Sequence, residues 1–169
     1  VVSVMRFGAY STHVLAPAHQ VFHRPDSLTA IQAAGMPCVY LTAYFALFLL
    51  AHPRRGDTVL IHSAAGGVGS AATQLARNAG CRTVGVVGAT HKVVDCGADE
   101  VIDKSVSDLW TEAERLAPDG YDVILDANGP STLKQSYEHL AAPGKLVVYG
   151  FHSMLPRTGG KPKWLKSAI

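Results

Sequence analysis

The stretch VLIHSAAGGVG, residues 59–69, decides the fold of this chain. Its first residues are β-branched or aliphatic, which favours a buried strand. The glycines of AAGGVG then form a tight turn, and the small and apolar residues 70–77 are typical of a helix. A strand, a glycine turn and a helix begin a βαβ unit whose helix N-terminus points free amide groups at a phosphate. The stretch therefore predicts a dinucleotide-binding fold, although Ala64 stands where the usual GxGxxG pattern has its first glycine.

Further apolar runs follow at 83–88, 100–103, 121–126 and 145–150. Polar, helix-compatible segments at about 106–117 and 131–142 separate the later runs. Val/Ile/Leu runs that alternate with helices are typical of a parallel sheet covered on both faces. We therefore expect an α/β protein with a Rossmann-type doubly wound parallel sheet.

The composition is that of a globular protein without an evident nucleic-acid surface. Of the 169 residues, 48% are hydrophobic and 17% are charged, and the net charge is +2. One local basic cluster, 161–166, is expected to be a solvated helix start. The separated cysteines Cys38, Cys81 and Cys96 form no CxxC pair, which favours a reducing cytosol and argues against a structural zinc.

The segment from Ala33 to Ala51 carries no charge, and its 19 residues are enough to cross a membrane. Gly35, Pro37 and the polar Thr42 fit a buried protein helix, preceded by a turn at Pro37, better than a helix in lipid. No signal-peptide pattern is visible. We therefore expect no membrane span and a cytoplasmic protein.

Residues 1–30 do not continue the βα pattern. Residues 2–5 predict a short strand, and the alternation in 9–16 predicts a second one. We expect 1–30 to be the tail of an all-β domain that leads into a dinucleotide-binding domain over 31–169. The chain begins with Val1 and shows no sixth strand, so we expect a piece of a longer protein with an incomplete nucleotide domain.

Several sequence blocks stand in a characteristic order and spacing. They are FGAY at 7–10, YLTAY at 40–44, GDTVLIH at 56–62, AAGGVG at 64–69 and GADEVI at 97–102. Together they resemble the zinc-independent, quinone-oxidoreductase-like branch of the medium-chain dehydrogenase/reductase superfamily, and the tail is most similar to the vesicle amine transport protein subgroup. The resemblance covers nearly all of this chain but only part of a typical member. It implies a GroES-like catalytic domain before the Rossmann domain and a homodimer for the full-length protein.

The end of the second strand indicates which nicotinamide cofactor is bound. That strand ends at Gly88, where an acidic residue would bind the 2′-hydroxyl of NAD. Thr90 instead offers a hydrogen-bond donor and Lys92 a positive charge, although Lys92 has the alternative of being an ordinary solvated residue. The resemblance implies that Lys92 holds a 2′-phosphate, so NADPH is the expected cofactor, with Lys104 as a second source of charge.

The chain departs from its relatives between Lys92 and Gly97. This segment is shorter than in most relatives by about three residues, close to one helical turn. We therefore expect the helix after the second strand to be truncated or disordered, with either an altered phosphate pocket or a part of the chain missing from this sequence.

The chemistry requires groups that polarise the hydride acceptor. The resemblance places Tyr40 and Thr42 near the nicotinamide as candidate catalytic residues, with helix packing as the alternative for each. Cys38 falls on a zinc-ligand position of the zinc-dependent relatives, but its alternative is a small buried apolar residue, and we expect no metal. His152 and Ser153 are candidate donors to a substrate carbonyl.

Parallel sheets bind ligands at the carboxyl ends of their strands. From the glycine turn, the second strand and the later strand ends, the expected cofactor-binding residues are Ala65, Gly66, Gly67, Val68, Gly69, Gly88, Thr90, Lys92, Lys104, Asn128, Tyr149, Gly150 and Phe151.

The sequence thus predicts an NADPH-dependent oxidoreductase that transfers hydride to a quinone or another α,β-unsaturated carbonyl. We expect this segment to be poorly active on its own. One alternative is a non-enzymatic NADPH-binding protein associated with vesicles or lipid. Another is a zinc-dependent alcohol dehydrogenase. We expect a small-molecule substrate and no nucleic-acid partner, and the sequence does not identify the substrate.

Overall fold

The computed structural model describes residues 1–155. The chain divides into two compact units, Val1–Leu41 and Thr42–Ile169, and each is described by itself. The division falls inside the helix Ala30–Tyr44, near its end, whereas the expected domain boundary near residue 30 falls at its start.

In the first unit, β1 (Val2–Ser3) pairs antiparallel with β2 (Val21–Phe22). The strand expected at 9–16 does not form, and this prediction is wrong. An alternating pattern becomes a strand only where a neighbouring strand accepts its hydrogen bonds, and the described structure provides no such partner for this segment.

Helix α1 (Ala30–Tyr44) begins after a capping box. The Thr29 amide donates to Gln32 Oε1 at 2.9 Å, and the Gln32 amide donates to Thr29 Oγ1 at 3.3 Å. Pro37 lies inside this helix, so the turn expected there is wrong.

A π-helix, Phe45–Ala51, continues α1 without a break. Ala46 and Leu47 are buried, whereas Phe45 and Leu49 are each 53% exposed, so the expected burial is found only in part. By length and composition alone, residues 30–51 are apolar enough to cross a membrane. A single helix of this kind is weak evidence, because core helices of folded domains also satisfy the criterion.

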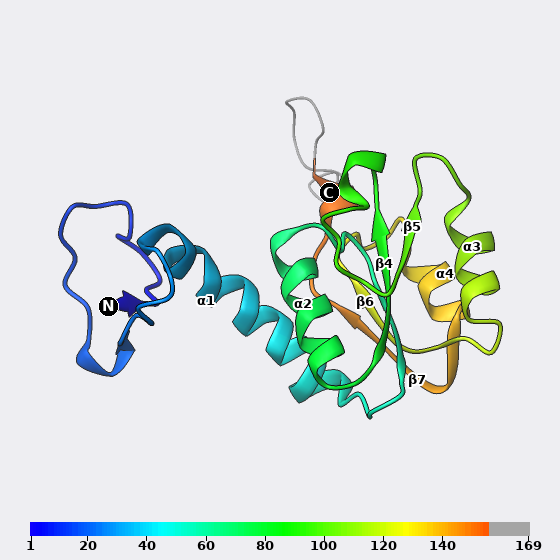
Figure 1. Ribbon diagram of the computed structural model, residues 1–169, viewed down its shortest axis with the longest axis horizontal. Coiled ribbons are helices and arrows are strands. Elements are labelled where there is room, and N and C mark those ends of the chain that lie inside the picture. The colour runs from blue at the N-terminus through cyan, green and yellow to red at the C-terminus, as the bar shows by residue number, and fades with distance from the viewer. Residues whose placement is uncertain (156–169) are drawn as a thin grey trace, which may run out of the picture. The chain divides into compact units, whose positions relative to one another are not determined.

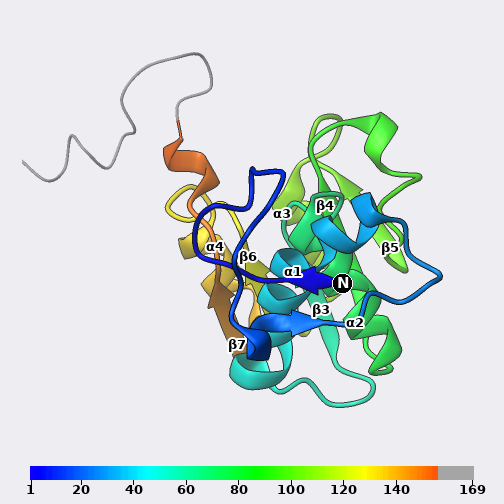
Figure 2. The same cartoon turned by 90° about the vertical axis from the view of Figure 1, so that its left-hand side faces the viewer.

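The second unit contains a five-stranded parallel sheet, as the sequence predicts. Its strands are β3 (Thr58–Ile61), β4 (Arg82–Val87), β5 (Glu100–Asp103), β6 (Tyr121–Asp126) and β7 (Leu140–Val148). Their order is β5-β4-β3-β6-β7, with β5 and β7 at opposite edges (Figures 1 and 2). The chain therefore runs outward from β3 to one edge and returns to β6, which opens a crevice where the direction reverses.

Helices cover both faces of this sheet (Figure 1). α2 (Gly67–Asn78) lies on one face, and α3 (Leu109–Leu116) and α4 (Leu133–Glu138) lie on the other. The helix expected to be truncated after the second strand is reduced to a single 3₁₀ turn, Thr90–Lys92. α4 is shorter than the segment expected, because β7 already begins at Leu140, which pairs with Tyr121 of β6.

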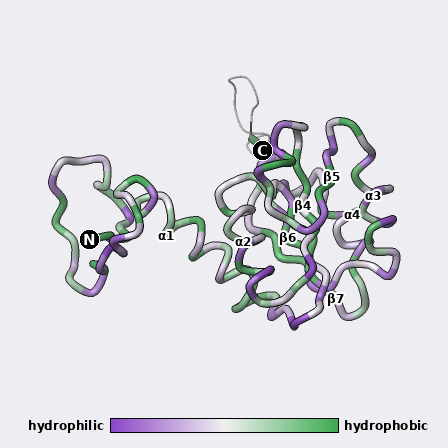
Figure 3. The backbone as a smooth tube through the Cα atoms, in the orientation of Figure 1, coloured by the Kyte–Doolittle hydropathy of each residue, from purple (hydrophilic) through white to green (hydrophobic). Residues whose placement is uncertain are grey.

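The central strands of the sheet are largely hydrophobic (Figure 3). On the α3 face, Leu60, Val84 and Ile124 join a core cluster that includes Ala113. On the α2 face, the small residues of α2 let that helix approach the sheet closely. Burial of both faces explains why the strands read as continuous apolar runs.

The first turn of α2 lies against the backbone of the glycine loop. A Cβ atom added at Gly69 would lie 2.3 Å from the carbonyl oxygen of Ser63 and 2.7 Å from the Cα of Ala64. Both are backbone atoms, so no side-chain movement can relieve the clash. Glycine at this position is what lets the helix start directly over the turn.

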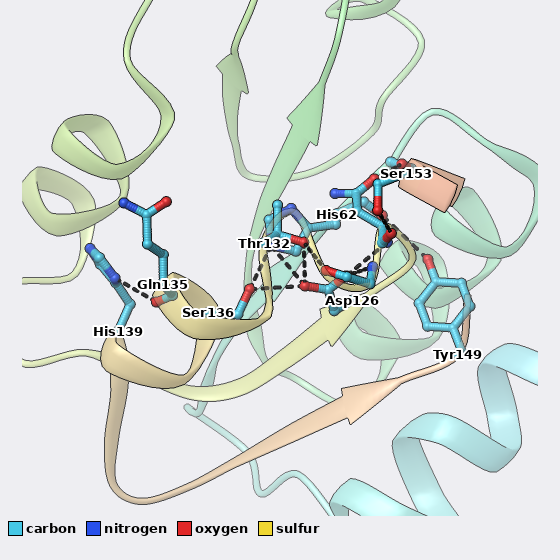
Figure 4. Close-up of polar contacts among 11 residues, drawn as sticks. His62, Asp126, Thr132, Gln135, Ser136, His139, Tyr149 and Ser153 are labelled. Atoms are coloured by element: carbon cyan, nitrogen blue, oxygen red, sulfur yellow. Dashed lines mark hydrogen bonds and ion pairs between the residues drawn. The ribbon is translucent and has the colours of Figure 1, made fainter. Parts of the chain in front are cut away.

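A buried carboxylate ties the β6–α4 connection together (Figure 4). Asp126 Oδ1 accepts from the amides of Asn128 and Gly129 at 2.7 and 2.9 Å. Its Oδ2 accepts from the hydroxyls of Thr132 and Ser136 at 2.7 and 3.0 Å. Burial would raise the pKa of Asp126, but these hydrogen bonds hold it below its ordinary value.

His62 completes this network from the end of β3. Its Nε2 lies 3.1 Å from Ser136 Oγ and 3.8 Å from Asp126 Oδ2, and the residue is fully buried. Burial lowers the pKa of His62 to about 4, against the opposing attraction of Asp126. The imidazole is therefore neutral in the folded protein, as suits an anchor for the turn.

Gly69→Ala is expected to lower the free energy of unfolding by about 2 kcal/mol or more, because the new methyl group meets backbone atoms. Urea denaturation measures this loss. Gly88→Ala is the control: its Cβ would lie 3.5 Å from Lys104 Cε, an ordinary contact, so the change should stay within about 0.5 kcal/mol. Equal stabilities of the two variants would contradict the close approach.

His62→Gln is expected to flatten the acid dependence of stability. In the unfolded chain this histidine has an ordinary pKa near 6.5, whereas in the folded chain its pKa is about 4. The unfolded chain therefore binds this proton at a higher pH than the folded chain. The stability that neutral His62 allows is thus present above pH 6.5 and is lost as the pH falls toward 4. Between pH 7 and 4.5 the parent should lose about 2 kcal/mol more than the variant in urea denaturation. Parallel curves would show that His62 is not the group responsible.

Candidate functional site

A cleft of about 860 Å³ lies at the carboxyl ends of the parallel strands. Its volume is within the range of small-molecule sites. The described residues that line it belong to the second unit and lie between Ser63 and Leu155. The lining consists of Ser63, Ala65, Gly66, Val68, Val86, Val87, Gly88, Lys92, Lys104, Ala127, Asn128, Tyr149, Gly150, Phe151, His152 and Leu155.

The floor of the cleft is the N-terminus of α2. Gly66 occupies the N-cap position and has no side chain to cap the helix. The amides of Gly67 and Val68 open the first turn, where no preceding turn supplies an acceptor carbonyl. These amides and the positive end of the helix dipole favour an anion such as a diphosphate.

The side formed by β4 and β5 is positively charged. Gly88 has no side chain at the end of β4, and the Lys104 side chain lies next to it. Lys92 and Lys104 both line the cleft, and within residues 1–155 neither ammonium group forms a salt bridge. A ligand phosphate would find two cations here without an acidic competitor bound to either.

Thr90 stays a predicted cofactor-binding residue. It does not line the cleft, and its hydroxyl donates to Asp103 Oδ2 at 2.7 Å. Asp103 Oδ1 accepts from the hydroxyl and amide of Ser105 at 2.6 and 2.9 Å. The hydrogen bonds from Ser105 and Thr90 hold the pKa of Asp103 below its ordinary value, so the carboxylate is charged.

The opposite side of the cleft comes from the loops after β6 and β7. Asn128 is 5% exposed, and its carbonyl accepts from the Ser153 hydroxyl at 2.6 Å. Among the described residues its buried side-chain Nδ2 has no hydrogen-bond partner, so an unsatisfied donor lies beside the cleft. The Ser153 hydroxyl is bound to Asn128 here, and its expected role as a donor to a substrate carbonyl stays a prediction.

Tyr149 completes this side of the cleft as a neutral phenol. Its hydroxyl donates to the His62 carbonyl at 3.3 Å. Burial raises the pKa of Tyr149 to about 12, so the phenol stays neutral. Next to it, a Cβ on Gly150 would lie 2.7 Å from the Ala127 carbonyl oxygen, so the two loops pack directly on each other.

The structure brings most of the expected cofactor-binding residues into this one cleft. Ten of the thirteen line it: Ala65, Gly66, Val68, Gly88, Lys92, Lys104, Asn128, Tyr149, Gly150 and Phe151. Gly67 and Gly69 lie just inside α2, and Thr90 faces Asp103. Tyr40 and Thr42 lie on α1 and do not line the cleft, so their catalytic role stays a prediction.

Sequence reasoning missed part of the lining and two of the groups that support it. Ser63, Val86, Val87 and Leu155 line the cleft but are not among the expected site residues. The rule that ligands bind at strand carboxyl ends indicates the strand-end residues among them. Asp103 and Asp126 carry no motif, because their roles depend on which hydroxyls the fold places beside them.

The described residues offer no site for a metal ion. Within residues 1–155, no three or more His, Cys, Asp or Glu side chains are grouped to hold one. Cys38 is exposed, contrary to the expectation of a buried apolar residue. The basic cluster expected at 161–166 lies outside the described residues.

Comparison with known proteins gives consistent relatives. A family model described as zinc-binding dehydrogenase matches residues 67–167. The synaptic vesicle membrane protein VAT-1 homolog of Rattus norvegicus is 38% identical over 92% of this chain and 39% of its own length. The quinone oxidoreductase of Pongo abelii is 34% identical over 85% of this chain and 45% of its own length.

Solved structures of the same kind share the fold. The quinone oxidoreductase from Thermus thermophilus, described with its NADPH complex, matches with a TM-score of 0.80 and 29% identity over 92% of this chain and 52% of its own. The chain thus spans about half or less of the relatives it matches. The family match, the strand order and these relatives together show that the chain belongs to the medium-chain dehydrogenase/reductase superfamily, in its quinone-oxidoreductase-like branch.

Proposed function

We propose that this chain is the nucleotide-binding part of an NADPH-dependent oxidoreductase that reduces a quinone or another α,β-unsaturated carbonyl. The observation that carries the proposal is the pair Lys92 and Lys104, which form no salt bridge within residues 1–155 and lie beside Gly88, the carboxylate-free end of β4. Relatives named quinone oxidoreductase and prostaglandin reductase 1, and a structural neighbour described with NADPH, support the same class of reaction.

Each side of the cleft has its own task in this proposal. The amides at the start of α2 hold the diphosphate, and Lys92 and Lys104 hold the 2′-phosphate on the β4–β5 side. Asn128 and the Tyr149–Phe151 loop then face the nicotinamide half, because they lie across the switch point from the lysines. NADPH supplies the hydride when bound, and the protein orients it. Tyr40 and Thr42 remain candidates for the hydroxyl that polarises the acceptor.

A second candidate is a non-enzymatic, vesicle-associated protein that binds NADPH. The names of the VAT-1 relatives and the apolar helix over residues 30–51 favour it. NADPH consumption by the full-length protein across a panel of quinones and enones separates the two. Turnover of at least one acceptor supports the reductase, whereas NADPH binding without any turnover supports the second candidate.

Lys92→Ala is expected to raise the Kd for NADPH by about tenfold while the Kd for NADH changes by less than about twofold, because the lysine faces only the 2′-phosphate. Isothermal titration calorimetry measures both values. Lys134→Ala is the matched control, since Lys134 is exposed, pairs with Glu138 at 3.7 Å and lies outside the cleft. Equal weakening of both nucleotides would contradict the assignment of Lys92.

Gly88→Asp is expected to reverse the cofactor preference. A carboxylate at the end of β4 would repel the 2′-phosphate and accept from the 2′-hydroxyl of NADH. We expect NADPH to bind about tenfold more weakly and NADH to bind more tightly in the same titrations. Gly88→Ala adds a methyl group without charge and should keep the preference for NADPH. A Gly88→Asp protein that still prefers NADPH would mean that the 2′-phosphate binds elsewhere.

A further inference from the structure

The connection between β4 and β5 has to place Lys92 without a helix. In this chain it contains one 3₁₀ turn, Thr90–Lys92, closed by the Lys92 amide on the Ala89 carbonyl at 3.0 Å and the Val93 amide on the Thr90 carbonyl at 3.1 Å. Such a short turn makes few contacts of its own. Lys92 itself is exposed, so packing of its side chain does not fix the turn.

One side-chain hydrogen bond links this turn to the rigid sheet. The Thr90 hydroxyl donates to Asp103 Oδ2 at 2.7 Å, and Asp103 is the last residue of β5. Asp103 is 8% exposed and pairs in register with Val87, the last residue of β4. The carboxylate therefore has a fixed position from which it can hold the turn.

The same carboxylate does not neutralise the lysines. Its other oxygen accepts from Ser105, and within the described part of the chain neither Lys92 nor Lys104 forms a salt bridge with it. Uncharged donors thus satisfy Asp103, while both ammonium groups remain available at the cleft.

We propose that Thr90 and Asp103 form a clamp that positions Lys92 for the 2′-phosphate of the dinucleotide. This inference rests on the proposed function and adds two positioning residues to it. The clamp thus holds in place a connection whose helical part is a single 3₁₀ turn. When it is present, less conformational entropy is lost as Lys92 engages the phosphate.

The test is Thr90→Val in the full chain, which removes the hydrogen bond and leaves the charge of Asp103 unchanged. We expect the Kd for NADPH to rise by about fivefold and the Kd for NADH to stay within about twofold, measured by calorimetry. Thr90→Ser keeps the hydroxyl and should restore NADPH binding. Thr111→Val is the matched control, because Thr111 also donates to a carboxylate, Asp108, at 2.8 Å but outside the cleft.

A double variant shows whether Thr90 acts through Lys92. If it does, Thr90→Val combined with Lys92→Ala should bind NADPH no more weakly than Lys92→Ala alone. Additive losses would overturn the clamp, as would an unchanged Kd in Thr90→Val or equal weakening of NADH.

Asp103→Ala gives a test by the sign of the effect. It removes a negative charge near the phosphate, so electrostatics alone would tighten NADPH binding, whereas loss of the clamp weakens it. Tighter binding would therefore overturn the clamp. If this variant does not fold, as judged by urea denaturation, the Thr90 variants decide the question. A parent chain that binds neither nucleotide, or that prefers NADH, would instead refute the proposed function.

Discussion

The structure depends on the contact between the first turn of α2 and the backbone of Ser63 and Ala64. Gly69 allows this contact, because any side chain there would collide with main-chain atoms. The helix consequently starts directly at the end of β3, and its unpaired amides face the crevice at the switch point. All other features of the cleft are arranged around this fixed source of positive potential.

The two sides of the cleft achieve order by different means. On the β6–β7 side, buried hydrogen bonds centred on Asp126 fix the backbone of Asn128 and Gly129, and His62 contributes as a neutral ring. On the β4–β5 side, exposed lysines carry the charge, and only a few side-chain bonds hold their segment. The first side is suited to placing a planar ring accurately, and the second to attracting a phosphate from solvent.

The sequence predicted the features that depend on local pattern. Apolar runs indicated the strands, and AAGGVG indicated the turn, since strand and glycine preferences act over a few residues. The shortened connection after Lys92 was also visible as missing length. Most expected cofactor residues line one cleft because the rule for strand carboxyl ends needs only the strand order.

The remaining features depend on contacts between distant residues. Thr90 and Asp103 meet only because β4 and β5 pair with Val87 opposite Asp103, and Ser153 reaches Asn128 only after β7 aligns with β6. Pro37 lies in a helix although its own preference favours a turn, and residues 9–16 alternate without a partner strand. Side-chain partners of this kind leave no periodic signal in the sequence.

The confinement of the cleft lining to residues 63–155 has a consequence for how such proteins diverge. One continuous stretch of the second unit supplies the glycine turn, both lysines and the loops after β6 and β7. A stretch of this kind can be inherited as one block of the gene, with its dinucleotide contacts kept together. A lineage built this way would keep its coenzyme as its chemistry diversifies.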